Sequence, residues 1–532
     1  MRLRPLSLAV TTVLAATACT LAAGPAQAAG NSLTVTTIGR NGARITSDLV
    51  LANTATGAMV QAKSGKAISL SRGQWSVVVD IQTPDKSPYR MSDTIAGAQV
   101  SVAGSTSLTL DARKGKPVTA SVDATSGKAA ASYGSEVTAV ACPTINFGAQ
   151  VGVYNVPGEV YEVPDPGATD LQFAWMQTWA GDMGSAQPQT NQFYAVTKET
   201  KGLPASAGIS YRQASMAEVS LQMRNGETSQ PVNSVMAQPA PQGQGCQTML
   251  YGYADMLGSG LTGHAYLSPG SWGLQGYNMT GAQGLDTSAS SNSLNLVAGH
   301  SYWQSFDLAV WGPRAGLPDV THRSVTYDPY ATIADTGSGT SGAADTHNAV
   351  TLSEGSKVLK RQTISTDYGS SPTFSAPISS AGWYDLAVTA TRVLKAQLST
   401  EVTLDWHFHA SPSTSEVAPG YQAVLSPGGM NYGNAASPRT TTPVTITLHR
   451  TDEPWSDSGQ AYAPESVKSV KVYASHDGGK TWQAVTAARV GSHWVAEVPE
   501  PAAAGSVALR TVAVDTAGDS STQTVYNAYL VD

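Results

Sequence analysis

The chain has 532 residues, enough for several domains, and only 13% of them are charged, about half the usual share. Its 51 glycines, 29 prolines and ordinary 41% of hydrophobic residues predict a turn-rich, globular, all-β protein and exclude coiled coils, collagens and disordered chains. The net charge of −7 argues against a nucleic-acid-binding protein, which would carry a basic face.

The first residues are typical of a secretory signal peptide. Arg2 and Arg4 precede an apolar stretch over residues 6–23, and the small-residue sequence Ala-Gln-Ala ends at Ala28. We therefore expect cleavage after Ala28 and a secreted, extracellular protein. The alternative is a lipoprotein signal ending at Cys19, which fits the length rule less well. No later run of about 18 apolar residues follows that could span a membrane.

Cysteine usage then predicts one disulfide. Removal of the signal peptide, with Cys19, leaves Cys142 and Cys246 as an even pair in an oxidising compartment. Their spacing matches neither a metal site nor a thioredoxin motif, so we expect a structural bond between them.

Residues 29–118 alternate like strands throughout. After Gly73, the side chains of Trp75, Val77 and Val79 fall on one face at a period of two. The pattern resembles that of the small prealbumin-like sandwiches found in many secreted bacterial proteins. We therefore expect a prealbumin-like β-sandwich at the N-terminus.

The rest of the chain is expected to contain two further β regions. Residues 119–410 are β-like but irregular, which predicts a central β domain with one disulfide. Residues 411–439 are rich in Ser, Pro, Gly and Asn, which predicts a linker. Residues 440–532 show alternating strands at a regular spacing, as in an Ig-like or fibronectin-like sandwich.

One strand offers candidate metal ligands. Asp405, His407 and His409 would share a strand face, and neutral imidazoles with a carboxylate are competent zinc ligands. The alternative is the polar outer face of a half-buried sandwich strand.

Aromatic side chains offer a candidate binding surface. Phe173, Trp175 and Trp179 would line one strand face, and Tyr251 with Tyr253 forms a second short ladder. Such platforms stack on sugar rings or hold extended peptides. The alternative, which the same periodicity allows, is the core of a sandwich.

Two motifs have a structural and a functional interpretation. Residues 475–482, Ser-His-Asp-Gly-Gly-Lys-Thr-Trp, match an Asp-box hairpin, in which Asp477 caps turn amides and Trp482 packs beneath. A sialidase would need several such boxes, so one box is structural. Asp335 stands in an Asp-Thr-Gly sequence, but aspartic-protease chemistry needs two such carboxylates, and we expect a turn aspartate.

Four segments together carry a family resemblance. They occur in order at residues 110–118, 302–313, 475–482 and 507–518. The set resembles the non-catalytic region that follows the protease domain of large secreted subtilisin-like serine peptidases of actinobacteria, and it covers nearly all of the mature chain. The His-Gly-Thr-His and Gly-Thr-Ser-Met-Ala motifs of those proteases are absent from the sequence. The resemblance thus implies accessory modules without their enzyme, and no catalytic residue can be transferred.

We therefore expect a secreted, non-catalytic accessory or binding protein that recognises an extracellular polymer or protein, either a peptide or a glycan. No cofactor is implied. One alternative is a secreted hydrolase with an unrecognised site in the central domain. A second is a cell-envelope scaffold or adhesin.

Overall fold

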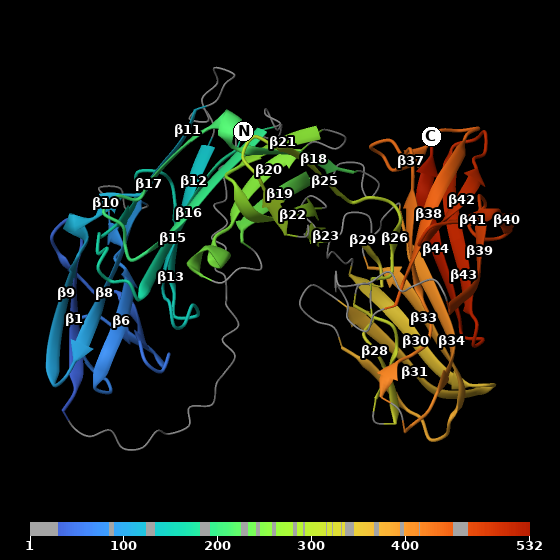
Figure 1. Cartoon of the computed structure of the whole chain (residues 1–532), viewed down its shortest axis with the longest axis horizontal. Coiled ribbons are helices and arrows are strands. Elements are labelled where there is room, and N and C mark those ends of the chain that lie inside the picture. Colours follow the sequence, from blue (N-terminus) through green and yellow to red (C-terminus); the bar gives the residue numbers. More distant parts are fainter. Residues whose placement is uncertain are drawn as a thin grey trace, which may run out of the picture.

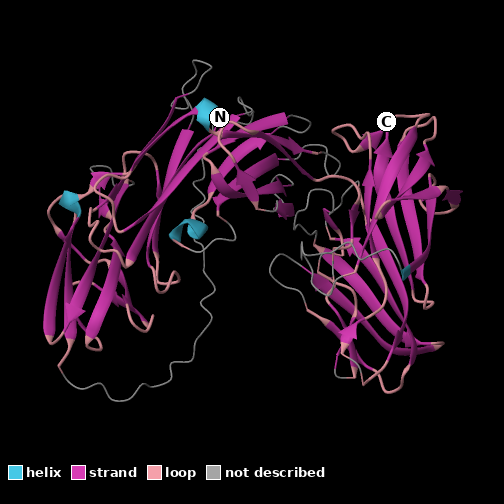
Figure 2. Ribbon diagram, in the orientation of Figure 1, coloured by secondary structure: helices cyan, strands magenta, loops and turns pink. Residues whose placement is uncertain are grey.

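The structure is a computed structural model in which almost every element is a β-strand (Figures 1 and 2). Its helices are single 3-10 turns, and no helix in the described part of the chain could cross a membrane. The predicted signal peptide and the residues 336–344 lie outside the described residues. The described residues are 30–84, 90–123, 134–180, 192–224, 232–240, 245–257, 262–279, 285–290, 293–314, 316–321, 323–330, 332–335, 345–366, 372–393, 398–413, 415–450 and 466–532.

The N-terminal module is a sandwich of two sheets, as predicted. Trp75, Val77 and Val79 point into the core between the sheets, together with Leu33 and Val35 of the opposite sheet. One sheet contains β2 (Arg44–Ile45), β1 (Ser32–Ile38) and β5 (Ala67–Ser69), with β9 (Ser105–Asp111) parallel to β1. The other has the order β10 (Lys116–Pro117), β14 (Val160–Glu162), β8 (Met91–Val102), β6 (Gly73–Asp80), β3 (Asp48–Asn53) and β4 (Met59–Lys63); β7 (Thr83–Pro84) pairs with β8, and η1 (Ala112–Lys114) follows β9.

The central module is built on a seven-stranded sheet and a five-stranded sheet, with a core that includes Trp272 and Phe306. The first has the order β13 (Val151–Asn155), β12 (Gly134–Pro143), β15 (Leu171–Ala180), β16 (Gln192–Lys201), β21 (Thr262–Leu267), β18 (Ala217–Met223) and β25 (Ser301–Phe306). The second has the order β20 (Gly252–Leu257), β19 (Val232–Pro239), β22 (Gly270–Met279) and β23 (Leu285–Ser290), with β24 (Leu294–Leu296) beside β22. Smaller elements are β11 (Thr119–Asp123), its partner β17 (Gly208–Arg212), η3 (Gln213–Ser215) and η4 (Cys246–Met249).

The two modules share a buried interface. Val78 and Ile95 lie on the face of the N-terminal sheet that turns away from its own core, and they pack against Phe173 and Trp175 of β15. In addition β14, which follows residue 118 in the chain, pairs in parallel with β8. The predicted boundary at 118 therefore cuts through one sheet and through the buried interface between the modules.

The C-terminal unit consists of two sandwiches that share one nine-stranded sheet (Figure 1). A single buried cluster extends from Ala309 to Val531. The shared sheet has the order β31 (Lys357–Thr366), β30 (Thr346–Glu354), β33 (Gly382–Arg392), β34 (Glu401–Ala410), β44 (Ser520–Val531), β43 (Gly505–Asp515), β39 (Val467–Ser475) and β40 (Gln483–Val485), with β37 (Ala435–Ala436) beside β44. The first backing sheet comprises β32 (Phe374–Pro377), β28 (Ser324–Tyr327), β27 (Asp319–Thr321) and β35 (Glu416–Val417); the second comprises β36 (Gln422–Pro427), β38 (Thr441–His449), β42 (His493–Pro499) and β41 (Ala487–Val490); β26 (Trp311–Gly312) pairs with β29 (Ala334–Asp335).

This arrangement corrects the predicted linker. Residues 411–439 contain β35, β36 and β37, and β36 is a full sheet partner of β38. The strand β34, assigned from the sequence to the central domain, pairs with β44 of the last sandwich, for example Val402 with Val525. Composition suggested a linker because Ser, Pro and Gly connect the short strands, but the partners of those strands lie far away in the sequence.

Candidate functional site

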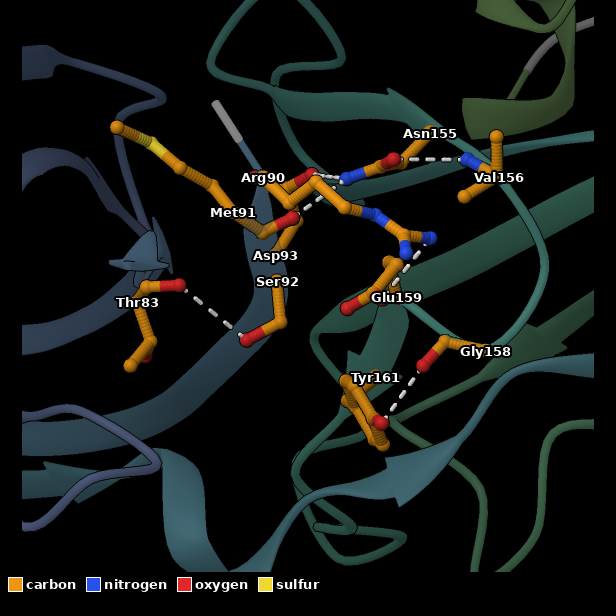
Figure 3. Close-up of polar contacts among 10 residues, drawn as sticks. All are labelled: Thr83, Arg90, Met91, Ser92, Asp93, Asn155, Val156, Gly158, Glu159 and Tyr161. Atoms are coloured by element: carbon orange, nitrogen blue, oxygen red, sulfur yellow. Dashed lines mark hydrogen bonds and ion pairs between the residues drawn. The ribbon is translucent and has the colours of Figure 1, made fainter. Parts of the chain in front are cut away.

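An open pocket of about 480 Å³ lies where the N-terminal module meets the central module. One wall comes from Gln82, which precedes β7, and from Arg90, Met91 and Asp93 at the start of β8. The other comes from the end of β13 and the turn before β14 (Figure 3). The lining residues are Gln82, Arg90, Met91, Asp93, Tyr154, Asn155, Val156 and Glu159.

Asp93 is the buried acidic group of this pocket, with 6% of its surface exposed. Gln82 Nε2 donates to its Oδ1 at 3.2 Å, and Asn155 Nδ2 donates to its Oδ2 at 2.7 Å. Asn155 also donates to the Met91 carbonyl at 2.9 Å (Figure 3). Because Asn155 belongs to the central module, these bonds fix the Asp93 carboxylate and join the two modules at the same point.

A second carboxyl group, Asp80, lies beside Asp93 and outside the pocket lining. Burial, and then the charge of Asp93, raise the pKa of Asp80 to about 8. Burial also raises the pKa of Asp93, whereas hydrogen bonds from Asn155, Gln82 and Asp80 oppose that rise. The proton of the pair is therefore favoured on Asp80, whose carboxyl group shares a hydrogen bond with Asp93.

The mouth of the pocket combines an ion pair with exposed apolar surface. An Arg90 guanidinium nitrogen lies 3.4 Å from Glu159 Oε1, across the junction (Figure 3). Met91, Tyr154 and Val156 expose large parts of their side chains beside this pair. Two carboxyl groups, one guanidinium and three exposed apolar or aromatic side chains thus line the pocket. This combination suits a cationic group on an aliphatic stem.

The predicted aromatic platform on β15 is wrong, because Phe173, Trp175 and Trp179 are buried. Phe173 and Trp175 have no exposed surface and Trp179 has 4%. The strand β15 lies in the middle of its sheet, with the N-terminal module on one face and the central core on the other. Neither face can hold a ligand. Tyr251 is half-buried next to β20, and the side chain of Tyr253 lies outside the described ones.

The predicted metal ligands do share one face of β34, but the structure does not assemble a metal site from them. His407 Nδ1 lies 2.7 Å from Asp385 Oδ1 of β33, and the His407 ring stacks on Trp383 with centroids 4.7 Å apart. His409 contacts the same indole edge-on at 5.6 Å, and Asp405 is exposed. Across the described residues, no group of three or more His, Cys, Asp or Glu side chains could hold a metal ion.

The predicted disulfide is confirmed. Cys142 of β12 and Cys246 of η4 are bonded, with Cα atoms 5.9 Å apart and both side chains buried. Beside it, the Cys246 amide donates to Glu199 Oε1 at 2.9 Å. The bond therefore holds η4 against the seven-stranded sheet, in a structural role.

The Asp-box forms the hairpin turn that the sequence predicts. Asp477 Oδ1 accepts from the Thr481 amide at 2.9 Å, and the Thr481 hydroxyl donates to Oδ2 at 2.6 Å. These bonds hold the pKa of Asp477 below its ordinary value. Asp335 is not in an open turn: it is buried in β29 and accepts from the Asp307 amide at 2.7 Å.

Sequence reasoning did not find the pocket. Its lining comes from two segments about 60 residues apart, around Asp93 and Asn155, with no recognisable motif in either. The sequence offered one weak signal. Asp93 stands near the start of the long strand β8, and a buried carboxylate needs hydrogen-bond partners.

Comparisons with known proteins add little. No family model and no curated protein matches the chain. Among solved structures, the FN1–FN3 domains of chicken CNTN1 align at 10% identity over 57% of this chain and 99% of theirs, with a TM-score of 0.15. The Bacillus anthracis TIE protein aligns at 10% identity over 68% of each chain, with a TM-score of 0.13. Escherichia coli alpha-2-macroglobulin activated by porcine elastase aligns at 9% identity over 90% of this chain and 50% of its own, with a TM-score of 0.15.

Proposed function

We propose that the protein is a non-catalytic binding protein that acts outside the cell, and that the junction pocket binds a positively charged side chain of a peptide or protein. The proposed export rests on the signal-peptide pattern and is supported by the disulfide of Cys142 and Cys246. The proposed binding rests on one observation, the fixed carboxylate of Asp93 inside an open pocket.

The pocket chemistry favours a cation. Ionised Asp93 and Glu159 supply two negative charges and Arg90 supplies one positive charge, so the lining of the pocket has a negative balance. An ammonium or guanidinium group would donate charge-assisted hydrogen bonds to both carboxylates. The aliphatic stem of the bound side chain would lie along the exposed side chains of Met91 and Val156.

Binding is favoured over hydrolysis because only one carboxyl group of the pair Asp80 and Asp93 lines the pocket. Both oxygens of Asp93 already accept hydrogen bonds from amides, and Asp80 lies outside the pocket lining. A pair of catalytic carboxyl groups would need to reach the same substrate bond or water molecule.

Isothermal titration calorimetry with blocked pentapeptides tests this function. A Gly-Gly-Lys-Gly-Gly peptide should bind, and the same peptide with acetyl-lysine should not. Glu159→Gln and Asp93→Asn should each weaken binding by about tenfold, the loss of one charge-assisted hydrogen bond. Arg90→Gln should strengthen binding, because the Arg90 guanidinium competes for Glu159.

Asp48→Asn is the matched control, since Asp48 is an exposed carboxylate of the same module whose ion pair with Lys63 lies on the surface. Thermal melts of each variant separate lost binding from lost folding. Equal affinity for the two peptides would contradict the proposal. Cleavage of either peptide by the wild-type protein, lost in Asp93→Asn, would support the hydrolase alternative instead.

A further inference from the structure

A second surface of the molecule is independent of the pocket: the outer face of the nine-stranded sheet. The inner face of this sheet covers the core, through side chains such as Leu386, Leu404 and Val525. The alternate side chains lie on the outer face and are exposed or half-buried along β30, β33, β34 and β44, except Thr524, which is buried. Hydroxyl groups are frequent among them, at Thr351, Thr389, Thr403, Ser520 and Thr522.

An exposed tryptophan stands at one end of this face. Trp383 of β33 is 40% exposed, and its ring stacks on His407 with an interplanar angle of 2°. Its six-membered ring also lies close to Gly518, where an added Cβ would be 3.5 Å away. The indole is therefore held in place by its neighbours while much of its surface faces solvent.

A second aromatic group stands at the other end. The Arg510 guanidinium lies over the Trp482 ring at 4.1 Å, and Tyr526 of β44 contacts Trp482 edge-on at 6.5 Å. Arg510 Nε also donates to Thr524 Oγ1 at 3.0 Å. These contacts fix the aromatic group, with the Arg510 guanidinium covering one face of the Trp482 ring.

The two groups are far apart on one surface. Both groups can be located by their partners on β34. Trp383 lies opposite His409, and Tyr526, which contacts Trp482, lies opposite Glu401, so the two groups are eight residues of β34 apart. At about 3.3 Å per residue this is ~26 Å along the strand direction. A ligand that contacts both groups must be an extended polymer and not a single small molecule.

The charges on the face select the type of polymer. The acidic side chains Asp385, Glu401 and Asp405 are matched by three basic ones, Arg361, Lys471 and Arg510. Such a balance gives no attraction for a strongly anionic or cationic chain. Aromatic rings separated by hydroxyl, carboxyl and guanidinium groups match sugar rings, which present C–H faces for stacking and hydroxyls for hydrogen bonds.

We propose that this face binds one extended chain of a neutral polysaccharide, with Trp383 and Trp482 stacking on sugar rings at its two ends. The polar side chains between them hydrogen-bond the hydroxyl groups of the rings that lie over β34 and β44. This binding does not depend on the pocket between the other two modules.

Affinity electrophoresis in gels that contain hydroxyethylcellulose, mixed-linkage β-glucan, glycol chitin, dextran or mannan tests the proposal, with alginate as the anionic comparison. We expect retardation by at least one neutral polysaccharide and none by alginate. Trp383→Ala and Trp482→Ala should each weaken the retardation by about tenfold. Asp405→Ala, at an exposed position between them, should also weaken it.

Trp303→Ala is the matched control, because Trp303 is an exposed tryptophan of the central module, with 55% of its surface accessible. It should migrate like the wild type, and so should Glu159→Gln, which alters only the pocket. Thermal melts identify any variant that fails to fold. Absence of retardation by every neutral polysaccharide, equal retardation of Trp383→Ala and wild type, or stronger binding to alginate would overturn the proposal.

Discussion

Asp80 and Glu162 flank Ile95 on three adjacent strands, so two carboxyl groups lie on the same sheet face at the junction of the N-terminal and central modules. Glu162 is fully buried, and among the described residues neither of its carboxyl oxygens has a hydrogen-bond partner. Burial raises the pKa of Glu162 to about 8, and burial with the charge of Asp93 raises that of Asp80 to about 8. The junction is therefore more stable while these two groups are protonated.

A dependence of stability on pH follows. In the unfolded chain these carboxyls titrate near pH 4, so the folded protein binds more protons than the unfolded one between about pH 4 and 8. Their stabilising effect is complete below about pH 4 and is lost as the pH rises through about 8. Each group changes the free energy of unfolding by up to ~1.4 kcal/mol per pH unit in that window.

Urea denaturation between pH 5 and 8.5 measures this effect. The urea concentration at the unfolding midpoint should fall steadily as the pH rises for the wild type. The fall should be smaller in Glu162→Gln, because glutamine imitates the protonated carboxyl group. Asp48→Asn, an exposed substitution in the same module, should follow the wild-type curve. Identical slopes for Glu162→Gln and wild type would show that Glu162 is ionised in the folded protein.

The disulfide should contribute a large part of the stability of the central module. Closing a loop of 104 residues is worth about 4–5 kcal/mol in the chain-entropy model. A variant with both Cys142→Ala and Cys246→Ala should lose roughly that amount in urea denaturation, and reducing agent should not change it further. In a chain without residues 1–28, thiol titration of the unfolded, unreduced protein should find no free thiol; two free thiols would contradict the bond.

Gly479 should be intolerant of any side chain. Its φ is +86°, and an added Cβ would lie 2.5 Å from Tyr526 Cε1. Gly479→Ala should therefore destabilise the protein by roughly 1–3 kcal/mol, because both the backbone and the packed ring oppose it. Gly505→Ala, where no atom lies within 4 Å of the added Cβ, is the control and should have little effect. Equal melting temperatures for the two variants would contradict this role of Gly479.

Local features of the fold could be predicted from the sequence. The alternation around Trp75 and Val77 identified a strand and its buried face correctly, because side chains of a strand alternate whatever its partners are. The Asp-box turn around Asp477 was also predictable, since its hydrogen bonds join residues only four positions apart.

Features that depend on distant partners could not be predicted. Alternation placed Phe173 and Trp175 on one face but could not show that a second module covers it. The predicted boundary within the C-terminal unit was wrong because β34 pairs with β44, which lies more than 100 residues later in the sequence. The pocket around Asp93 was missed for the same reason: its walls meet only in the folded chain.

The position of β44 affects when this protein can fold. It follows both β34 and β43 in the sequence, yet it lies between them inside the nine-stranded sheet. Until the residues of β44 have been synthesised and have crossed the membrane, the shared sheet exists only as two separate parts with open edges. Open edges invite pairing with other chains. If the protein is exported as proposed, these two parts can join into one sheet only after β44 has crossed the membrane.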